Sequence, residues 1–285
     1  MRQHRSLLAA GLLCVLLWGL AGCAPAQPEE IAPLKVTLFR VGKADAIVVQ
    51  AGAETMVIDV GEEEDGEEVV EFLRKQGVER VDVLLITHFD RDHVGGADTL
   101  VESVEVGQVL LPAYAGTSTE YLDFMAALET AQLTPTGLTD SLEFPLGAAT
   151  VLVEPPLSYD VTGMEEEFDN NFSLITTVTH GENRLLFTGD AEKQRVRQWL
   201  DAGTAQPCGF LKMPHHGVYQ TALADLLTAV TPDYAVICAS NKNPADVRTL
   251  ELLQEMGVQT LQTKDGNVTV FSDGSRLEIN QAIEH

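Results

Sequence analysis

Residues 87–96 read Thr-His-Phe-Asp-Arg-Asp-His-Val-Gly-Gly and directly follow an apolar run, Val83-Leu84-Leu85-Ile86. The pattern predicts a buried strand that ends here and a chain that turns on the two glycines. Neutral imidazole and carboxylate oxygen are ligands of divalent metals, and carboxylates placed this closely repel one another without a cation. The run therefore predicts part of a metal site at a strand end, with four candidate ligands: His88, Asp90, Asp92 and His93.

Other apolar runs end in residues of the same types. Leu185-Leu186-Phe187 leads to Asp190, Phe210–Met213 leads to His215 and His216, and Met56-Val57-Ile58 leads to Asp59. A polar cluster containing Asp169 and Asn170 opens a further predicted strand. Because one loop seldom supplies all the ligands of a metal, we expect these strand ends to meet.

Each of these residues also has a purely structural interpretation. Asp190 precedes a predicted helix and could cap it, and Asp59 could accept hydrogen bonds from backbone amides, the role that we favour for it. Adjacent histidines such as His215 and His216 are common on surfaces. His180 falls in a predicted hairpin turn, where we expect it to be exposed and without a role.

The order of the predicted elements indicates an α/β fold. Strands are predicted at residues 35–40, 46–50, 54–60, 81–87, 108–111, 141–144, 150–153, 172–179, 185–188, 210–213, 234–239, 260–263, 268–271 and 277–280. Helices are predicted at 67–76, 97–102, 118–132, 192–201, 223–230 and 246–256. Two similar halves, each with strands followed by alternating strands and helices, predict a four-layer αββα sandwich of two mixed sheets.

Taken together, these motifs resemble the metallo-β-lactamase-fold hydrolase superfamily. The most similar pattern is that of the C-terminal hydrolase domain of the ComEC-type competence proteins, which take up DNA. Three runs and one substitution carry the resemblance: Asn170-Asn171-Phe172-Ser173-Leu174, Leu186-Phe187-Thr188-Gly189-Asp190, Leu211-Lys212-Met213-Pro214-His215-His216-Gly217, and Asp90 in place of a second histidine. The chain is similar to the stand-alone, secreted relatives that lack the membrane channel.

The resemblance implies two divalent metal ions, zinc or manganese, and a role for each site residue. His88 and Asp90 would bind the first metal, and Asp92, His93 and His215 the second, with Asp190 as the bridge. His216 would line the pocket as a proton donor, although the sequence leaves open which of the two adjacent histidines is the ligand. Asp92, Asp190 and His216 are the residues expected to take part in catalysis. Asp59 would orient the ligands.

The chain departs from the family at several positions. A histidine usual before the bridging aspartate is missing, and Asp169 or Asn170 stands in its place as a further candidate ligand. An oxygen-rich first site with Asp90 favours Mn²⁺, with Zn²⁺ as the alternative. The segment Arg40-Val41-Gly42-Lys43-Ala44-Asp45 replaces the family's Asp-Val-Gly-Gln-Gly-Asp, and Val218 and Asn243 replace a usual Ser and His. The surroundings of the expected substrate therefore differ more than the metal ligands do.

The N-terminus has the pattern of a secretory signal. Arg2 and Arg5 precede the short apolar stretch Leu7–Leu20, and Leu20-Ala21-Gly22-Cys23 resembles the lipobox of bacterial lipoproteins. We therefore predict a lipoprotein signal peptide at 1–22, a lipidated Cys23 with a flexible tether at 23–33, and a hydrolase domain at 34–285. The protein would lie at the extracytoplasmic face of the cell membrane, held by its N-terminal lipid only.

Charge and cysteine content limit the partners. With 43 acidic and 18 basic residues, the chain has no global attraction for nucleic acid or anionic lipid, so a phosphate-bearing substrate would have to be held locally, by metal cations. Cys208 and Cys238 fall near opposite ends of neighbouring predicted strands, so we expect free thiols. No protein partner is evident.

These features predict a metal-dependent phosphoesterase or phosphodiesterase, nuclease-like activity included, that uses a metal-activated water. Two alternatives stay open. One is hydrolysis of a lactone, ester or β-lactam on the same centre. The other is a non-catalytic surface binding protein with a degenerate first metal site, an interpretation that the missing histidine favours.

Overall fold

The computed structural model describes residues 31–160 and 168–282, which belong to one folded unit. The predicted signal peptide at 1–22, Cys23 and most of the tether lie outside the described residues. Leu34, where the hydrolase domain was predicted to start, is the first residue of the first strand. Within the part of the chain that is described, no helix is both long enough and apolar enough to cross a membrane.

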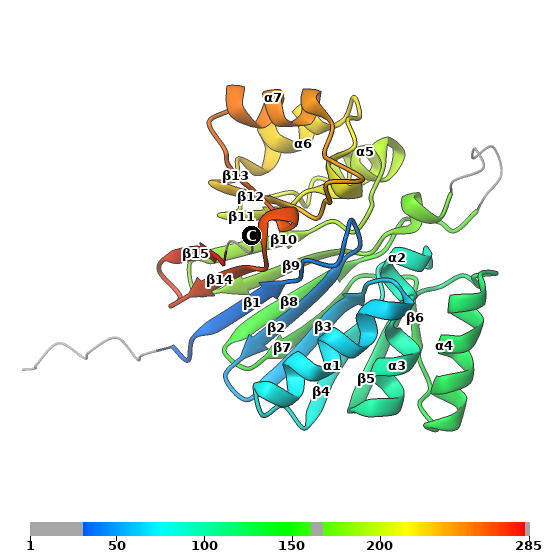
Figure 1. Ribbon diagram of the computed structural model, residues 1–285. Helices are drawn as coiled ribbons and strands as arrows, with labels where there is room; N and C mark the ends of the chain where they lie inside the picture. The colour runs from blue at the N-terminus through cyan, green and yellow to red at the C-terminus, as the bar shows by residue number, and fades with distance from the viewer. Residues whose placement is uncertain (1–30, 161–167, 283–285) are drawn as a thin grey trace, which may run out of the picture. The chain divides into compact units, whose positions relative to one another are not determined.

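Two mixed sheets form the centre of the domain (Figure 1). The first has the order β15-β14-β1-β2-β3-β4-β5-β6, and the second has the order β13-β12-β11-β10-β9-β8-β7. The strands of the first are β1 (Leu34–Leu38), β2 (Ala46–Ala51), β3 (Glu54–Val60), β4 (Arg80–Leu85), β5 (Glu105–Pro112), β6 (Thr136–Leu138), β14 (Val268–Ser272) and β15 (Leu277–Gln281). Those of the second are β7 (Leu142–Leu146), β8 (Ala149–Glu154), β9 (Ile175–His180), β10 (Asn183–Phe187), β11 (Phe210–Lys212), β12 (Tyr234–Ile237) and β13 (Gln259–Gln262).

Each sheet changes from antiparallel to parallel pairing part of the way across. In the first sheet, β1, β2 and β3 pair antiparallel, whereas β3, β4, β5 and β6 pair parallel. In the second, β7 to β10 pair antiparallel and β10 to β13 pair parallel. Among the parallel strands, most of β12 and the ends of β4 and β10 are buried and read as apolar runs, whereas the edge strand β13 has no fully buried residue.

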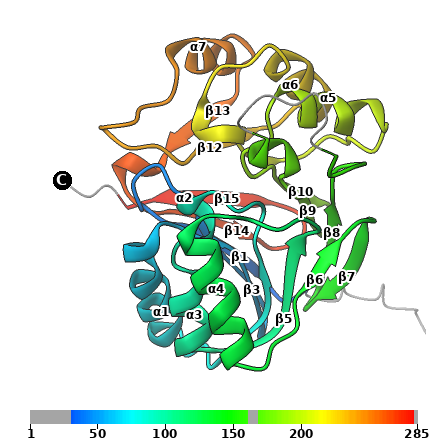
Figure 2. The same ribbon diagram turned by 90° about the vertical axis from the view of Figure 1, so that its right-hand side faces the viewer.

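Helices cover the outer face of each sheet, which completes the predicted αββα order (Figure 2). The first group is α1 (Gly66–Lys75), the short α2 (Arg91–Val94), α3 (Ala97–Ser103) and α4 (Thr119–Thr130); the second is α5 (Lys193–Asp201), α6 (Leu223–Val230) and α7 (Val247–Glu255). One apolar cluster fills the space between the sheets, and one lies beneath each helical group. The predicted fold class is confirmed.

Capping explains where two of the helices begin. The Ser118 hydroxyl accepts a hydrogen bond from the Tyr121 amide at the start of α4, and the Asp246 carboxylate accepts one from the Arg248 amide at the start of α7. Such side chains satisfy amides that have no partner within the helix.

Two local predictions were wrong. The strand predicted to start at Phe172 begins at Ile175, because Asp169–Phe172 forms a 3-10 turn closed by a hydrogen bond from the Ser173 amide to the Asn170 carbonyl. His180 is fully buried rather than exposed. Its ring nitrogens lie 2.7 Å from the Ser272 hydroxyl and 2.9 Å from the Ala32 carbonyl, so tertiary packing gives this turn residue a structural role. The prediction for the cysteines is confirmed: Cys208 and Cys238 are free and buried.

Candidate metal centre

The predicted site residues follow strands of both sheets. Asp59 is the penultimate residue of β3. The four residues of the opening motif follow β4 and lie in α2 and the loop before it. Asp190 follows β10, and a 3-10 turn (Pro214–Gly217) with the two adjacent histidines follows β11. Strand ends from two sheets thus supply side chains to one place, as the sequence predicted.

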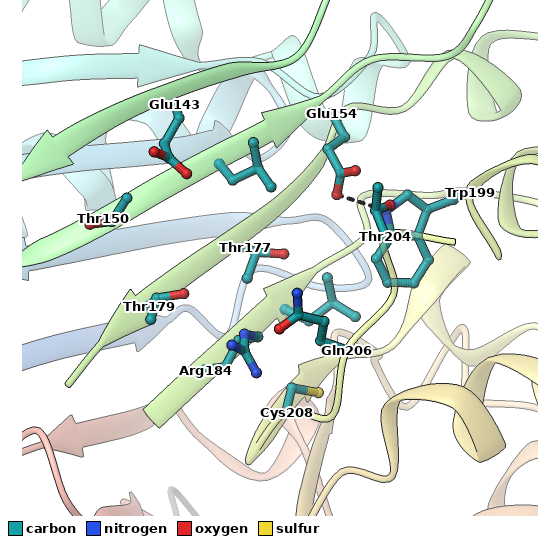
Figure 3. A pocket seen from close by; sticks show the side chains of 12 residues that line it. Glu143, Thr150, Glu154, Thr177, Thr179, Arg184, Trp199, Thr204, Gln206 and Cys208 are labelled. Carbon is teal, nitrogen blue, oxygen red and sulfur yellow. Dashed lines mark hydrogen bonds between the residues drawn. The ribbon is translucent and has the colours of Figure 1, made fainter. Parts of the chain in front are cut away.

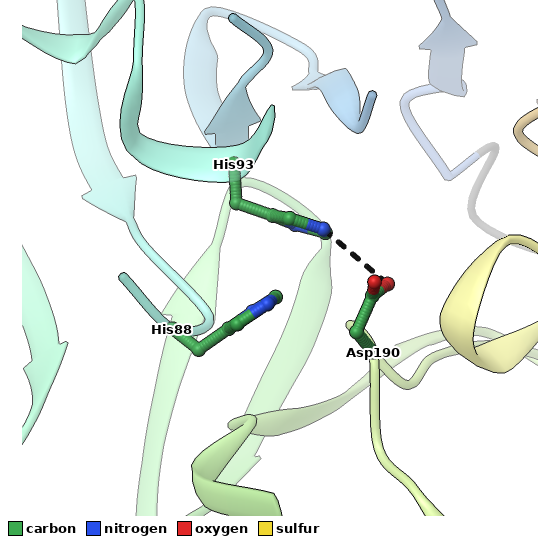
Figure 4. Close-up of side chains that lie close together, drawn as sticks. All are labelled: His88, His93 and Asp190. Atoms are coloured by element: carbon green, nitrogen blue, oxygen red, sulfur yellow. Dashed lines mark ion pairs between the residues drawn. The ribbon is translucent and has the colours of Figure 1, made fainter. Parts of the chain in front are cut away.

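Three groups of potential ligand atoms form there, each with its atoms within 4.8 Å of one another; in the third, Asp45, Asp59 and His93, both acids lie near His93 Nδ1, which is hydrogen-bonded to Asp59. We call the set His88, His93 and Asp190 the His88 group, and the set Asp92, His93 and His216 the His216 group; all their members are buried. Figure 4 shows the rings of His88 and His93 directed toward the Asp190 carboxylate. His93 belongs to both groups, so the two candidate cation positions are neighbours.

Asp190 lies between the two groups. One carboxylate oxygen is 3.3 Å from His93 Nε2, and the other is 2.8 Å from His216 Nε2. His216 Nε2 also lies 3.3 Å from an Asp92 oxygen. A carboxylate whose two oxygens face different imidazoles has the geometry needed to bridge two cations.

Asp59 orients two of the imidazoles. One of its oxygens accepts hydrogen bonds from the Thr87 hydroxyl and from His93 Nδ1, both at 2.7 Å. Since the Thr87 hydroxyl donates to Asp59, it accepts at 3.0 Å from His88 Nδ1. A neutral imidazole held in this way carries its proton on Nδ1 and directs its Nε2 lone pair inward, as metal-binding histidines do.

Strained backbone aims the second pair of histidines. His215 and His216 have φ values of 45° and 50° and Gly217 has 74°, so three successive residues are left-handed. Each such non-glycine residue costs on the order of 1–3 kcal/mol, and this strain is typical of functional sites. A Cβ on Gly217 would lie 2.9 Å from Ile237 Cγ2, so only glycine fits at the end of this turn.

The turn separates the two histidines. His216 faces the centre, whereas His215 has its side chain 21% exposed and its Nδ1 3.3 Å from a Glu192 oxygen. His215 belongs to neither group of potential ligands among the described residues. The geometry thus favours His216 over His215 as a ligand, the alternative that the sequence left open.

The residues expected near the first metal are more loosely arranged. The Asp90 side chain is 41% exposed, and its carboxylate lies 3.5 Å from His88 Nε2. Burial raises the pKa of Asp169, with the nearby Asp90 charge adding to this, although Tyr114 donates a hydrogen bond to it. The buried Asn170 amide donates to a Glu192 oxygen at 3.2 Å. Asp169 belongs to no ligand group in the described structure.

Two residues of the centre were not predicted from the sequence. Asp45 is buried and its carboxylate lies 3.8 Å from His93 Nδ1, while the fully buried Lys212 pairs with it. The Lys212 ammonium also donates to the Gly189 carbonyl at 3.0 Å and lies 3.4 Å from Asp190. The sequence signal that could have identified this pair is a lysine inside the apolar run 210–213, because a buried lysine needs a carboxylate partner.

A further cation lies against the His216 group. Lys43 is half-buried, and its Nζ lies 2.7 Å from an Asp92 oxygen. This contact and the neighbouring carboxylates outweigh burial and raise the pKa of Lys43. The Lys43 ammonium therefore offsets the charge of Asp92, one of the expected metal ligands.

The charges of the centre shift one another's pKa values. Burial alone would lower the pKa of His93 and of His216, but the Asp190 charge and other carboxylates raise both above the usual range. Burial would raise the pKa of Asp92 and of Asp190, yet the neighbouring imidazoles hold both well below it. Without a cation, protons thus compensate the buried negative charge.

The donor atoms fit a divalent cation. The Nε2 atoms of His88, His93 and His216 are buried and make no hydrogen bond of good geometry within the described residues. Buried polar atoms normally have a partner, so such atoms directed at one point indicate a missing ligand. Imidazole nitrogen with carboxylate oxygen suits zinc or manganese.

A separate cavity of about 220 Å³ lies on the second sheet (Figure 3). Thr177, Arg184 and Glu143 line it, and Trp199 Nε1 donates to the Glu154 carboxylate at 2.7 Å at its border. None of the residues of the His88 or His216 group lines this cavity.

Comparison with known proteins agrees with this geometry. Residues 40–240 match the model of the metallo-beta-lactamase superfamily, and the chain belongs to that family. Among curated proteins it is 25% identical to ComE operon protein 3 of Bacillus subtilis, over 94% of this chain and 36% of that protein. It is 25% identical to Recombination protein 2 of Haemophilus influenzae, over 87% of this chain and 30% of that protein.

The chain thus spans about a third of the length of these curated relatives. Among solved structures, the metallo-beta-lactamase fold protein YhfI from Bacillus subtilis superposes with a TM-score of 0.58 at 9% identity, covering 87% of this chain and all of that one. This likeness concerns the fold. The predicted family and its relation to competence proteins are confirmed.

Proposed function

We propose that this protein is a metal-dependent hydrolase of phosphoesters, phosphodiesters among them. The observation that carries the proposal is the pair of ligand groups that share His93 and are joined by the two oxygens of Asp190. Adjacent two-cation centres are typical of enzymes that cleave phosphoesters, because one ion can serve the attacking oxygen and the other the leaving oxygen.

We assign His88, Asp90 and Asp190 to one cation, and Asp92, His93, Asp190 and His216 to the other. This assignment replaces His215 by His216 as a ligand. When bound, the cations would lower the pKa of a coordinated water and offset charge on the phosphoryl group. Asp59 orients His88 and His93, and the exposed Asp90 carboxylate supplies a hard oxygen that favours Mn²⁺ over Zn²⁺.

The test is hydrolysis of bis-(p-nitrophenyl) phosphate by the purified protein with Mn²⁺ or Zn²⁺. Asp190→Ala removes the shared carboxylate and should abolish turnover. Asp201→Ala, which changes an exposed acid at the end of α5, is the matched control and should keep it. Absence of turnover with both metals would refute the proposal.

The loose arrangement around Asp90 favours one alternative, a binding protein with a single metal or none. Elemental analysis distinguishes the two, because the proposed enzyme should bind two ions per chain. A panel of neutral esters and lactones tests the other alternative, acyl hydrolysis, which predicts turnover of these substrates and none of phosphodiesters.

We further propose that the enzyme is anchored by lipid at the extracytoplasmic face of the membrane. The Leu-Ala-Gly-Cys run at residues 20–23 supports this, although it lies outside the described residues. Growth with labelled palmitate should label the wild-type protein and leave Cys23→Ala unlabelled. Equal labelling of both would refute lipidation at this cysteine.

A further inference from the structure

A basic pocket lies beside the metal centre of this acidic chain. Its volume is about 350 Å³, and it is lined by Arg40, Gly42, Ala239, Ser240, Asn241, Lys242 and Lys264. Three of these residues are basic and none is acidic, whereas the whole chain has 18 basic and 43 acidic residues. Positive charge is therefore concentrated here against the general composition.

Hydrogen bonds hold the walls of this pocket together. The Arg40 amide donates to Asn267 Oδ1 at 2.7 Å, and its Nε donates to the Lys264 carbonyl at 3.1 Å. The Ala239 amide donates to the Thr263 hydroxyl at 3.1 Å, which joins the loop after β12 to the segment that carries Lys264. Three segments distant in the sequence are thus fixed around one hollow.

The two lysines that line the pocket, Lys242 and Lys264, form no ion pair with an acid among the described residues. No carboxylate oxygen of the described residues lies within 4.0 Å of the Lys242 or Lys264 ammonium nitrogen. Lys242 is exposed and Lys264 is half-buried, so both ammonium groups can be reached from solvent. An anion held by Lys242 and Lys264 would therefore not have to displace a carboxylate from either lysine.

Adjacent residues of the β1–β2 loop contact the pocket and the metal centre. Gly42 lines the pocket, and the next residue, about 3.8 Å along the chain, is Lys43, whose ammonium contacts Asp92 of the His216 group. Asp45, in the same loop, contacts His93. A substrate held at the two ligand groups could therefore extend past Lys43 into the pocket.

We propose that this basic pocket binds a second phosphate of the substrate whose phosphoester is hydrolysed at the metal centre. The inference rests on the proposed phosphoesterase function and narrows it to substrates with more than one phosphate, such as short nucleic-acid strands. The ammonium groups of Lys242 and Lys264, with the Ser240 and Asn241 side chains, provide the donors that a phosphate needs. Binding of a phosphate in this pocket would let a protein with a large negative net charge hold a substrate that carries several negative charges.

The test compares two probes that differ by one phosphate: a thymidine dinucleotide with and without a 5′-phosphate. Binding is measured by calorimetry on the full chain carrying Asp190→Ala, so that neither probe is consumed. We expect the phosphorylated probe to bind at least about fivefold more tightly, and this preference to weaken at high salt.

Substitutions of the pocket lysines test whether the preference for the phosphorylated probe arises in this pocket. Lys242→Glu with Lys264→Glu should reduce the ratio of the two affinities to one or below, and Lys242→Arg with Lys264→Arg should retain it. The control Arg74→Glu with Lys75→Glu, in the last turn of α1, makes the same change in net charge at residues that do not line the pocket. It should also retain the preference for the phosphorylated probe. Equal melting temperatures would show that all variants fold.

A ratio of one in the unmodified pocket, or a ratio that survives the double glutamate change, would overturn the proposal. Its failure is distinct from failure of the phosphoesterase function. Turnover of bis-(p-nitrophenyl) phosphate together with a ratio of one refutes only the second phosphate site. A ratio above five without any turnover refutes only the catalytic function.

Discussion

The two ligand groups share His93 but differ in how firmly their other members are held. In the His216 group, every member is buried, and strained backbone and short contacts to Asp190 fix the imidazole. On the side of the His88 group, the additional acid, Asp90, has its side chain 41% exposed, and the Asn170 amide donates to a Glu192 oxygen. The comparison indicates one firmly built cation position and one weaker position.

The largest effect is expected from the adjacent histidines. His216→Ala removes a ligand from the firm position and should lower turnover roughly a thousandfold and remove one metal ion per chain, because a cation contributes several kcal/mol to catalysis. His215→Ala should change turnover less than about tenfold and keep both ions. Kinetics with elemental analysis measure both, and the reverse order would restore His215 as the ligand.

Asp59→Asn tests whether one carboxylate supports both groups. Its amide can no longer accept from His93 and the Thr87 hydroxyl in the same way, so both imidazoles lose their preferred proton position. Metal affinity should fall about 10–100-fold, as it does on loss of groups that orient ligands. Titration with Mn²⁺ or Zn²⁺ followed by calorimetry measures this. A fall in affinity at one position only would show that Asp59 serves a single group.

The pH dependence of metal binding should distinguish the groups. In the metal-free protein the pKa values of His93 and His216 are raised by nearby carboxylates, so a cation must displace their protons. Affinity at the His216 group should therefore keep increasing as the pH rises above the usual histidine pKa, up to the raised values. Calorimetry in buffers of different ionisation enthalpy should detect proton release. Constant affinity as the pH rises above about 6.5, the usual histidine pKa, would contradict it.

The same raised values affect stability without metal. A histidine whose pKa is raised by folding stabilises the folded state below its unfolded pKa, and this contribution is lost as the pH rises through the folded pKa. Urea denaturation of the metal-free protein should consequently show a lower free energy of unfolding at pH 9 than at pH 6, and added metal should reduce the difference.

The smallest effect is expected from a repair of the weak position. Asp90→His introduces the nitrogen ligand usual in the family and should raise the affinity of that position for Zn²⁺ relative to Mn²⁺, by about tenfold. The exposed side chain has room for an imidazole, so the melting temperature should change little. An unchanged preference would mean that Asp90 does not bind the metal.

Much of the fold follows from local patterns in the sequence. The apolar runs at 83–85 and 185–187 become the buried ends of strands β4 and β10. The exceptions are short or dependent on contacts made elsewhere. β6 has three residues and no clear pattern, and His180 is buried because Ser272 and Ala32, distant in the sequence, provide partners for both of its ring nitrogens.

By itself, the sequence determined that His88, Asp92, His93, Asp190 and the adjacent histidines follow strands, because hydrophobic periodicity and turn residues are local properties. Only the tertiary structure decided which histidine of the pair faces the centre, since backbone torsions at 215–217 set that direction. It also placed Asp45, Lys43 and Lys212 against the ligands and gathered the basic pocket. Those contacts join residues far apart in the chain, and the packing of two sheets creates them.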